Sequence, residues 1–162
     1  MSNTLHIICP TDFLETEIYR QFGGENYFFT SLAISASFED LLIHHLAKTI
    51  DKKRIHRIVL SLRDDNKVIN QHQSSKRNND DLQSIGKLGT YKTQSMSLWN
   101  IRDKRFLFIS HLLNSQLSHL QARLDYFGYT NLEFEALIYN SHDCTFSSTY
   151  NDIIFSTANT LN

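Results

Sequence analysis

The chain has 162 residues, of which 41% are hydrophobic and 12% are aromatic. That length and apolar content are typical of one globular domain and exclude an intrinsically disordered chain. Its 16 basic and 17 acidic residues nearly cancel, so no strong field favours nucleic acid or an anionic membrane surface. We therefore expect a single domain over residues 1–162, with neither nucleic acid nor membrane as a partner.

The N-terminal residues and the cysteines predict a cytoplasmic location. The first residues lack a basic segment, and their apolar run of about five residues is too short for a signal peptide. No stretch approaches the roughly 20 apolar residues that span a bilayer. The chain has two cysteines, Cys9 and Cys144, too few for a disulfide framework. We expect both thiols to be reduced, as is usual in the cytoplasm.

The N-terminal segment predicts a strand followed by a helix. Residues 5–9 are short, apolar and β-branched, and Pro10 bounds them, which is typical of a buried strand. Asp12 then stands at an N-cap position with Glu15 three residues on, as in a capping box, and Phe13 is the first apolar anchor of the helix. Gly23–Gly24 would end that helix.

The next segments continue the alternation. Residues 26–34, rich in aromatic and apolar side chains, predict a second strand, and Ser37 would cap a second helix. Apolar residues at helical spacing support that helix, namely Phe38, Leu41, Leu42, Leu46 and Ile50. Residues 51–54 read as a turn into a third strand over 55–62. A β-α-β-α-β order favours a parallel sheet with right-handed crossovers.

The second half begins with a polar insertion at about 66–100, which has no apolar periodicity and is either mobile or functional. Apolar residues three or four apart then predict a long helix over 103–127, ended by Gly128. Residues 132–139 and 145–150 predict a hairpin with its turn at 140–144, and the tail 151–162 is expected to be peripheral. The expected fold class is α/β, three-layered, with a mostly parallel central sheet and a C-terminal antiparallel strand or hairpin.

Polar residues follow the first and third strands, where ligands collect at the edge of a parallel sheet. Cys9 is either a thiolate near a helix N-terminus or, as we favour, a small buried side chain at a strand end. Asp64 and Asp65 could bind a hard cation, although a polar turn is the simpler account of two neighbouring carboxylates. The cluster His142–Cys144 is too tightly spaced for a standard zinc motif and suits a hairpin turn.

The order and spacing of these segments resemble the β-class carbonic anhydrases. In that family a first strand ends in Cys-x-Asp-x-Arg, a Gly-Asp-aromatic strand follows, and a further strand ends in Gly-His-x-x-Cys-Gly. A variable segment, a long helix and a final strand similar to Gly-Trp-x-Tyr-Asp complete the pattern. The segments here that stand in these places are residues 7–13, 22–28, 58–65 and 135–140.

The resemblance implies a zinc ion held by two Cys thiolates and one His, beside an Asp-Arg pair. Cys9 falls on the first ligand, but Thr11 and Phe13 fall on the Asp-Arg pair, with Asp12 one position out of register. Leu62 falls on the His and Asp65 on the second Cys. The family's ligand set is therefore not retained, and we expect no catalytic, cofactor-binding or metal residues, with zinc present only if the site has been rebuilt.

Three functions remain open. The first, which we favour, is a non-catalytic protein that binds a small ligand or a protein partner at a vestigial pocket around Cys9, Asp12, Leu62 and Asp65. The second is an enzyme, a hydrolase or lyase, with a site rebuilt from Cys9, Asp12 and Asp65. The third is a role in assembly through the strand 26–34 or the helix 103–127. Because β-class enzymes commonly dimerise, the resemblance also implies a homodimer.

Overall fold

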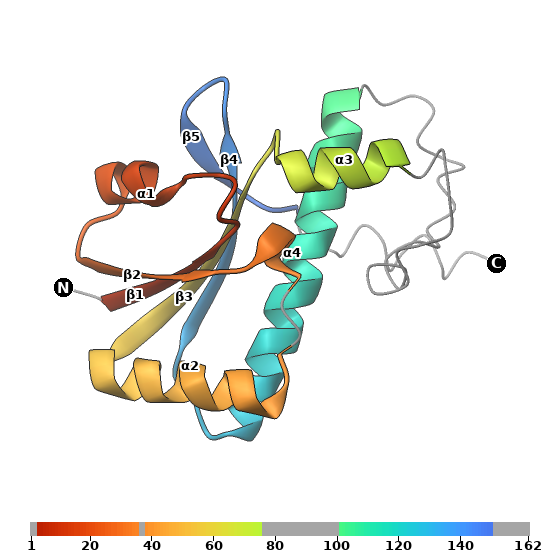
Figure 1. Cartoon of the computed structure of the whole chain (residues 1–162). Coiled ribbons are helices and arrows are strands. Elements are labelled where there is room, and N and C mark those ends of the chain that lie inside the picture. The colour runs from red at the N-terminus through yellow and green to blue at the C-terminus, as the bar shows by residue number, and fades with distance from the viewer. Residues whose placement is uncertain (1–2, 36–37, 76–100, 151–162) are drawn as a thin grey trace.

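The computed structural model describes residues 3–35, 38–75 and 101–150 and has a five-stranded sheet at its centre (Figure 1). The strand order is β2-β1-β3-β4-β5, and every neighbouring pair is parallel except the hairpin of β4 and β5. The strands are β1 (Asn3–Ile8), β2 (Glu25–Thr30), β3 (Ile55–Arg63), β4 (Glu133–Asn140) and β5 (Thr145–Ser148).

Helices cover both faces of this sheet. They are α1 (Glu15–Gln21), the 3-10 turn η1 (Leu32–Ile34), α2 (Asp40–Lys53), α3 (Lys67–Ser75) and α4 (Ile101–Tyr126). On one face, Ile18 of α1 packs with Ile8 of β1 and Tyr139 of β4. Residues of α2, α3 and α4 pack on the other face, and Figure 1 shows α4 running alongside the sheet. This is a three-layer α/β arrangement.

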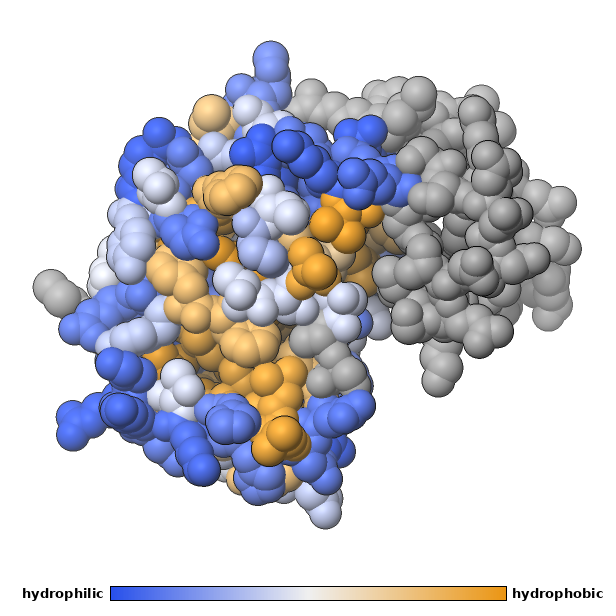
Figure 2. Space-filling model, in the orientation of Figure 1, coloured by the Kyte–Doolittle hydropathy of each residue, from blue (hydrophilic) through white to orange (hydrophobic). Residues whose placement is uncertain are grey.

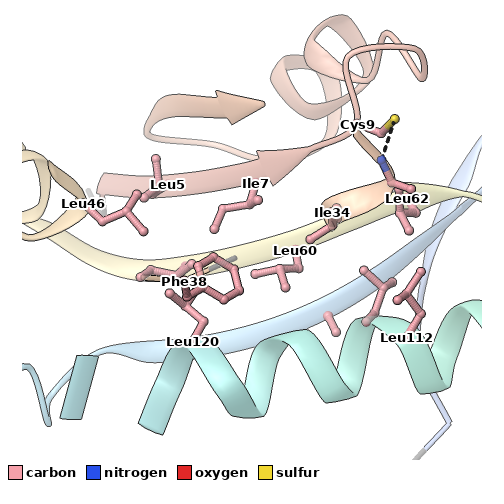
Figure 3. Packing of buried hydrophobic residues seen from close by; sticks show 14 of the residues in the cluster. Leu5, Ile7, Cys9, Ile34, Phe38, Leu46, Leu60, Leu62, Leu112 and Leu120 are labelled. Atoms are coloured by element: carbon pink, nitrogen blue, oxygen red, sulfur yellow. Dashed lines mark hydrogen bonds between the residues drawn. The ribbon is translucent and has the colours of Figure 1, made fainter. Parts of the chain in front are cut away.

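The larger core lies between the sheet and the α2, α4 layer (Figure 3). Leu5 and Ile7 of β1 and Leu60 of β3 point into it, whereas Ile8 belongs to the opposite face. Because successive side chains of a strand alternate between faces, β1 and β3 are buried on both sides, and apart from Thr4, His6 and Ser61 their buried side chains are apolar. These mostly apolar segments are the pattern from which the sequence analysis predicted the two central strands.

The structure confirms the expected fold class, including the antiparallel C-terminal hairpin. Boundaries differ by a few residues: the first strand spans Asn3–Ile8, the second helix reaches Lys53, and the long helix spans Ile101–Tyr126. Gly128 follows α4 with a positive φ, which supports its role in ending that helix. Helix α1 instead ends at Gln21 with Phe22 as an extended C-cap, so the expected glycine cap at Gly23–Gly24 is wrong, and the positive φ of Gly24 belongs to the turn into β2. The proposed cap Ser37 and the tail 151–162 lie outside the described residues.

The capping-box interpretation of Asp12 is wrong. Helix α1 starts at Glu15 after Leu14, and no side chain caps it. Asp12 instead points across the sheet edge and accepts hydrogen bonds from residues after β3. Phe13, expected as an apolar anchor, has a positive φ and is 76% exposed. The local sequence around Asp12 is typical of an N-cap, but the position of its side chain is set by hydrogen bonds to Arg63 and Asn66.

Three further expectations need correction. The second strand ends at Thr30, and Leu32 and Ile34 belong to η1 rather than to the strand. Leu41, expected on the apolar face of the second helix, is 73% exposed. The insertion begins with a regular helix, α3, while residues 76–100 of it lie outside the described part.

No helix in the described ranges has both the length and the apolar content to cross a membrane.

Candidate functional site

The carboxyl ends of β1 and β3 form the corner where a ligand crevice is expected. The chain leaves β1 toward β2 on one side, and β3 leads to β4 on the other, so the strand order reverses between β1 and β3. In open parallel sheets such a reversal opens a crevice at the carboxyl edge. In this protein the side chain of Asp12 lies there, and we call its surroundings, residues 9–12 and 62–66, the switch-point corner.

Asp12 joins the two loops of this corner. Its Oδ2 accepts the backbone N–H of Arg63 at 2.9 Å, and its Oδ1 accepts the side-chain amide of Asn66 at 2.6 Å. The side chain is buried, with 1% of the residue exposed. Burial raises the pKa of Asp12 from 3.8 to about 6, and the hydrogen bonds from Arg63 and Asn66 oppose that rise. A buried carboxyl group therefore bridges the two loops of this corner.

Asn66 connects the corner to helix α3. Its Oδ1 accepts the backbone N–H of Ile69 at 3.0 Å, which is the bond that an N-cap residue makes. Its amide nitrogen donates to Asp12, so the oxygen and the nitrogen of this buried side chain each make a hydrogen bond. The sequence analysis did not single out Asn66, although an Asn before a helical stretch is an N-cap signal.

Cys9 is buried, as the more conservative interpretation expected. Its Sγ lies 3.1 Å from Thr11 Oγ1 and accepts the backbone N–H of Ala33 at 3.2 Å (Figure 3). Ala33 and Ile34 both have positive φ values, which are unusual for residues with a Cβ and costly for a β-branched one. The Thr11 hydroxyl and the Ala33 backbone N–H are therefore the hydrogen-bonding partners of the Cys9 sulfur.

Leu62 and Asp65 lie on the β3 side of the corner, and Leu62 belongs to the same buried core as Cys9. Leu62 is fully buried in the larger core. Asp65 turns toward Arg63, whose guanidinium binds both carboxylate oxygens at 2.7 and 3.0 Å. This ion pair lowers the pKa of Asp65. Asp65 also lines a cavity, together with its neighbour Asp64.

That cavity lies at the carboxyl ends of β3 and β4 beside α4 and has a volume of about 520 Å³. We call it the β3-β4 pocket. Its lining is Asp64, Asp65, Arg105, Phe106, Asn140, Ser141 and His142. Asp64 fixes its floor, because Oδ1 accepts both the backbone N–H and the hydroxyl of Ser141, at 3.1 and 2.7 Å. A volume of this size is in the usual range for small-molecule sites.

The sequence located the two carboxylates of this pocket but missed most of its other residues. His142 was noted as part of a turn cluster, and it does lie in the turn between β4 and β5. Arg105 and Phe106 come from a helix that begins more than thirty residues after β3, and nothing in their local sequence marks them. Across the described residues, no three His, Cys, Asp or Glu side chains are grouped so that they could hold a metal ion.

The chain matches no protein-family model and no curated protein. It is similar to solved structures. The β-carbonic anhydrase CafD of the fungus Aspergillus fumigatus is 15% identical, with a TM-score of 0.68 over 93% of this chain and 90% of that one.

Two more solved structures extend the likeness. A tetrameric β-carbonic anhydrase of the ascomycete Sordaria macrospora is 10% identical, with a TM-score of 0.59 over 91% of this chain and 80% of that one. The enzyme of Coccomyxa, solved with acetazolamide, is 12% identical, with a TM-score of 0.58 over 91% and 71%. At these identities the likeness establishes the fold, which is the one that the sequence resemblance implied.

Proposed function

We propose that this chain, which has the β-carbonic anhydrase fold, is a non-catalytic protein that binds a small molecule at the carboxyl edge of its sheet. The observation that carries the proposal is the Asp12 side chain, which occupies the switch-point corner and hydrogen-bonds to Arg63 and Asn66. Because this carboxyl group already fills the switch-point corner, we place the ligand in the neighbouring β3-β4 pocket.

The donor set at the corner does not fit zinc. A structural or catalytic zinc ion needs three or four nitrogen, sulfur or carboxylate ligands around one point. Cys9 Sγ is surrounded by Thr11 and the backbone of Ala33, and the position that resembles the zinc-binding His is the buried hydrocarbon Leu62. Asp65 is bound to Arg63. Loss of soft ligands lowers zinc affinity steeply, which supports a protein without hydratase chemistry.

The test is a stopped-flow CO₂ hydration assay on the full chain with added zinc. We expect the rate of the uncatalysed reaction, with no difference between the wild type, Cys9→Ser and the control Cys144→Ser. A zinc-dependent rate above background that Cys9→Ser abolishes and Cys144→Ser leaves intact would refute the proposal.

One observation favours the second candidate, an enzyme rebuilt around Cys9, Asp12 and Asp65. The raised pKa of Asp12, about 6, suits a general acid or base, and such shifts concentrate at active sites. However, the carboxyl oxygens of Asp12 are already bound by Arg63 and Asn66. If any hydrolase or lyase activity is found, its dependence on pH near 6 and its loss in Asp12→Asn would favour this candidate over binding.

We also propose that the protein is a homodimer. Strand β2 is an edge strand that pairs with β1 alone within the described part of the chain, and unpaired edges invite a second copy. On the face shown in Figure 2, apolar side chains gather around β2 and η1, where Leu32 is 56% exposed. Light scattering is expected to give twice the chain mass for the wild type and for Tyr126→Glu, but the single mass for Leu32→Glu. A wild-type monomer at micromolar concentration would contradict this.

A cytoplasmic location is proposed as well. Cys9 and Cys144 are both free, one buried and one exposed, which agrees with a reducing compartment. Cell fractionation of the tagged full chain tests it, and recovery from the secreted fraction would overturn it.

A further inference from the structure

The β3-β4 pocket contains two opposite charges that do not pair with each other. Asp64 and Arg105 both line it, yet the two side chains form no ion pair. Arg105 has no hydrogen-bond or ion-pair partner anywhere in the described ranges. An arginine has five N–H donors in a planar fork suited to a carboxylate, so a carboxylate ligand would satisfy it.

The other charges of the pocket are already compensated. Asp65 is neutralised by the two-point ion pair with Arg63. Asp64 receives neutral donors alone: Oδ1 binds Ser141 twice, and Oδ2 has no partner in the described structure. The pocket therefore presents one unpaired acceptor with a negative charge and one unpaired cationic fork.

We propose that the β3-β4 pocket binds a free α-amino acid with an apolar side chain. Its ammonium group donates to Asp64, its carboxylate accepts from Arg105, and its side chain lies against Phe106. The two opposite charges of the ligand would each meet one of the two unpaired charges that line the pocket. This identification rests on the proposed binding function and specifies the ligand class.

Single-charge ligands fit the same lining less well. An anion alone would satisfy Arg105 but would share the pocket with the carboxylate of Asp64, and like charges in one site repel. A cation alone would leave Arg105 without a partner. The volume, about 520 Å³, leaves ample room for a single amino acid beside Phe106, which itself packs edge-on against Tyr150 at 4.9 Å.

Isothermal titration of the full chain tests the assignment with three probes that share one ring: L-phenylalanine, phenethylamine and 3-phenylpropionate. Loss of one of two charge-assisted contacts should weaken binding about tenfold or more. We therefore expect L-phenylalanine to bind at least about tenfold more tightly than either truncated probe.

Two variants identify the contacts. Asp64→Asn keeps an oxygen for Ser141 but loses the charge, and it should weaken L-phenylalanine about tenfold without weakening 3-phenylpropionate. Arg105→Gln should weaken L-phenylalanine and leave phenethylamine unchanged. Lys48→Gln and Asp125→Asn, both exposed on other helical surfaces, are the charge-matched controls and should bind as the wild type does.

Equal affinity for all three probes, tighter binding of 3-phenylpropionate or phenethylamine than of L-phenylalanine, or no binding at all would overturn the amino-acid assignment. Those results would leave the non-catalytic proposal standing, because that proposal fails on zinc-dependent CO₂ hydration and not on this titration.

Discussion

His6 and Asp12 are buried titratable side chains whose pKa values shift in opposite directions. The Nε2 of His6 lies 2.9 Å from Asn26 Oδ1, while its Nδ1 has no partner among the described residues. Protonation would place a second N–H at that orphan atom, and burial lowers the pKa of His6 to about 4. Burial raises the pKa of Asp12 to about 6. The two shifts have opposite signs over nearly the same pH range.

The linkage works in opposite directions for the two groups. The raised pKa of Asp12 contributes stability that is full below about pH 4 and is lost as the pH rises through about 6. The lowered pKa of His6 contributes stability that is full above about pH 6.5 and is lost as the pH falls through about 4. Each shift of about two units corresponds to about 3 kcal/mol, so the two contributions largely offset each other in the wild type.

Separating these groups gives the first prediction. In Asp12→Asn the free energy of unfolding should rise by about 3 kcal/mol from pH 4 to 6.5, because His6 acts alone. In His6→Gln, whose amide can still donate to Asn26, it should fall by a similar amount over that range. Urea unfolding at several pH values measures both, and slopes of the same sign in the two variants would contradict the assignment.

At the scale of elements, the start of α3 depends on a single side chain. Asn66 caps the helix through Oδ1 and donates to Asp12 through its amide. Asn66→Ala should cost about 2 kcal/mol, since it removes a cap and leaves a buried carboxyl oxygen without its donor. Asn66→Ser keeps a capping oxygen and should lose only part of that. Equal losses for both substitutions in urea unfolding would show that the cap contributes nothing.

The end of α4 depends on backbone conformation. Gly128 has a φ of 92°, and the backbone N–H of Tyr129 bonds back to Leu124 at 3.0 Å. A Cβ at Gly128 would meet no atom within 4 Å, so the cost of Gly128→Ala is conformational alone, about 1 kcal/mol. Gly23→Ala is the matched control, because its site is equally open and its φ is not positive. Similar melting temperatures for the two variants would argue against this explanation.

For the whole molecule, hydrophobic periodicity was enough to predict the order of elements and the parallel sheet. Strands β1 and β3 are mostly apolar over their buried residues, and α4 repeats apolar residues every three or four positions. Those signals are local. They predicted the sheet edge at which the loops carrying Cys9, Asp12 and Asp65 begin, because the carboxyl ends of parallel strands meet at one edge.

What the side chains do at that edge could not be predicted in the same way. Asp12 had the sequence context of an N-cap, yet it bonds to Arg63 and Asn66, about fifty residues away. Arg105 reaches the β3-β4 pocket from the start of a helix that follows a long insertion. The local sequence around Asp12 or Arg105 does not predict these positions, since both depend on how distant segments of the chain pack.

We propose that a buried carboxyl network, rather than a metal ion, holds the switch-point corner together. Elemental analysis of the full chain, expressed with added zinc and purified without chelator, tests it most directly. The account predicts far less than one zinc atom per chain in the wild type, and the same in Cys9→Ser. One zinc atom per chain in the wild type, lost in Cys9→Ser and kept in Cys144→Ser, would contradict it.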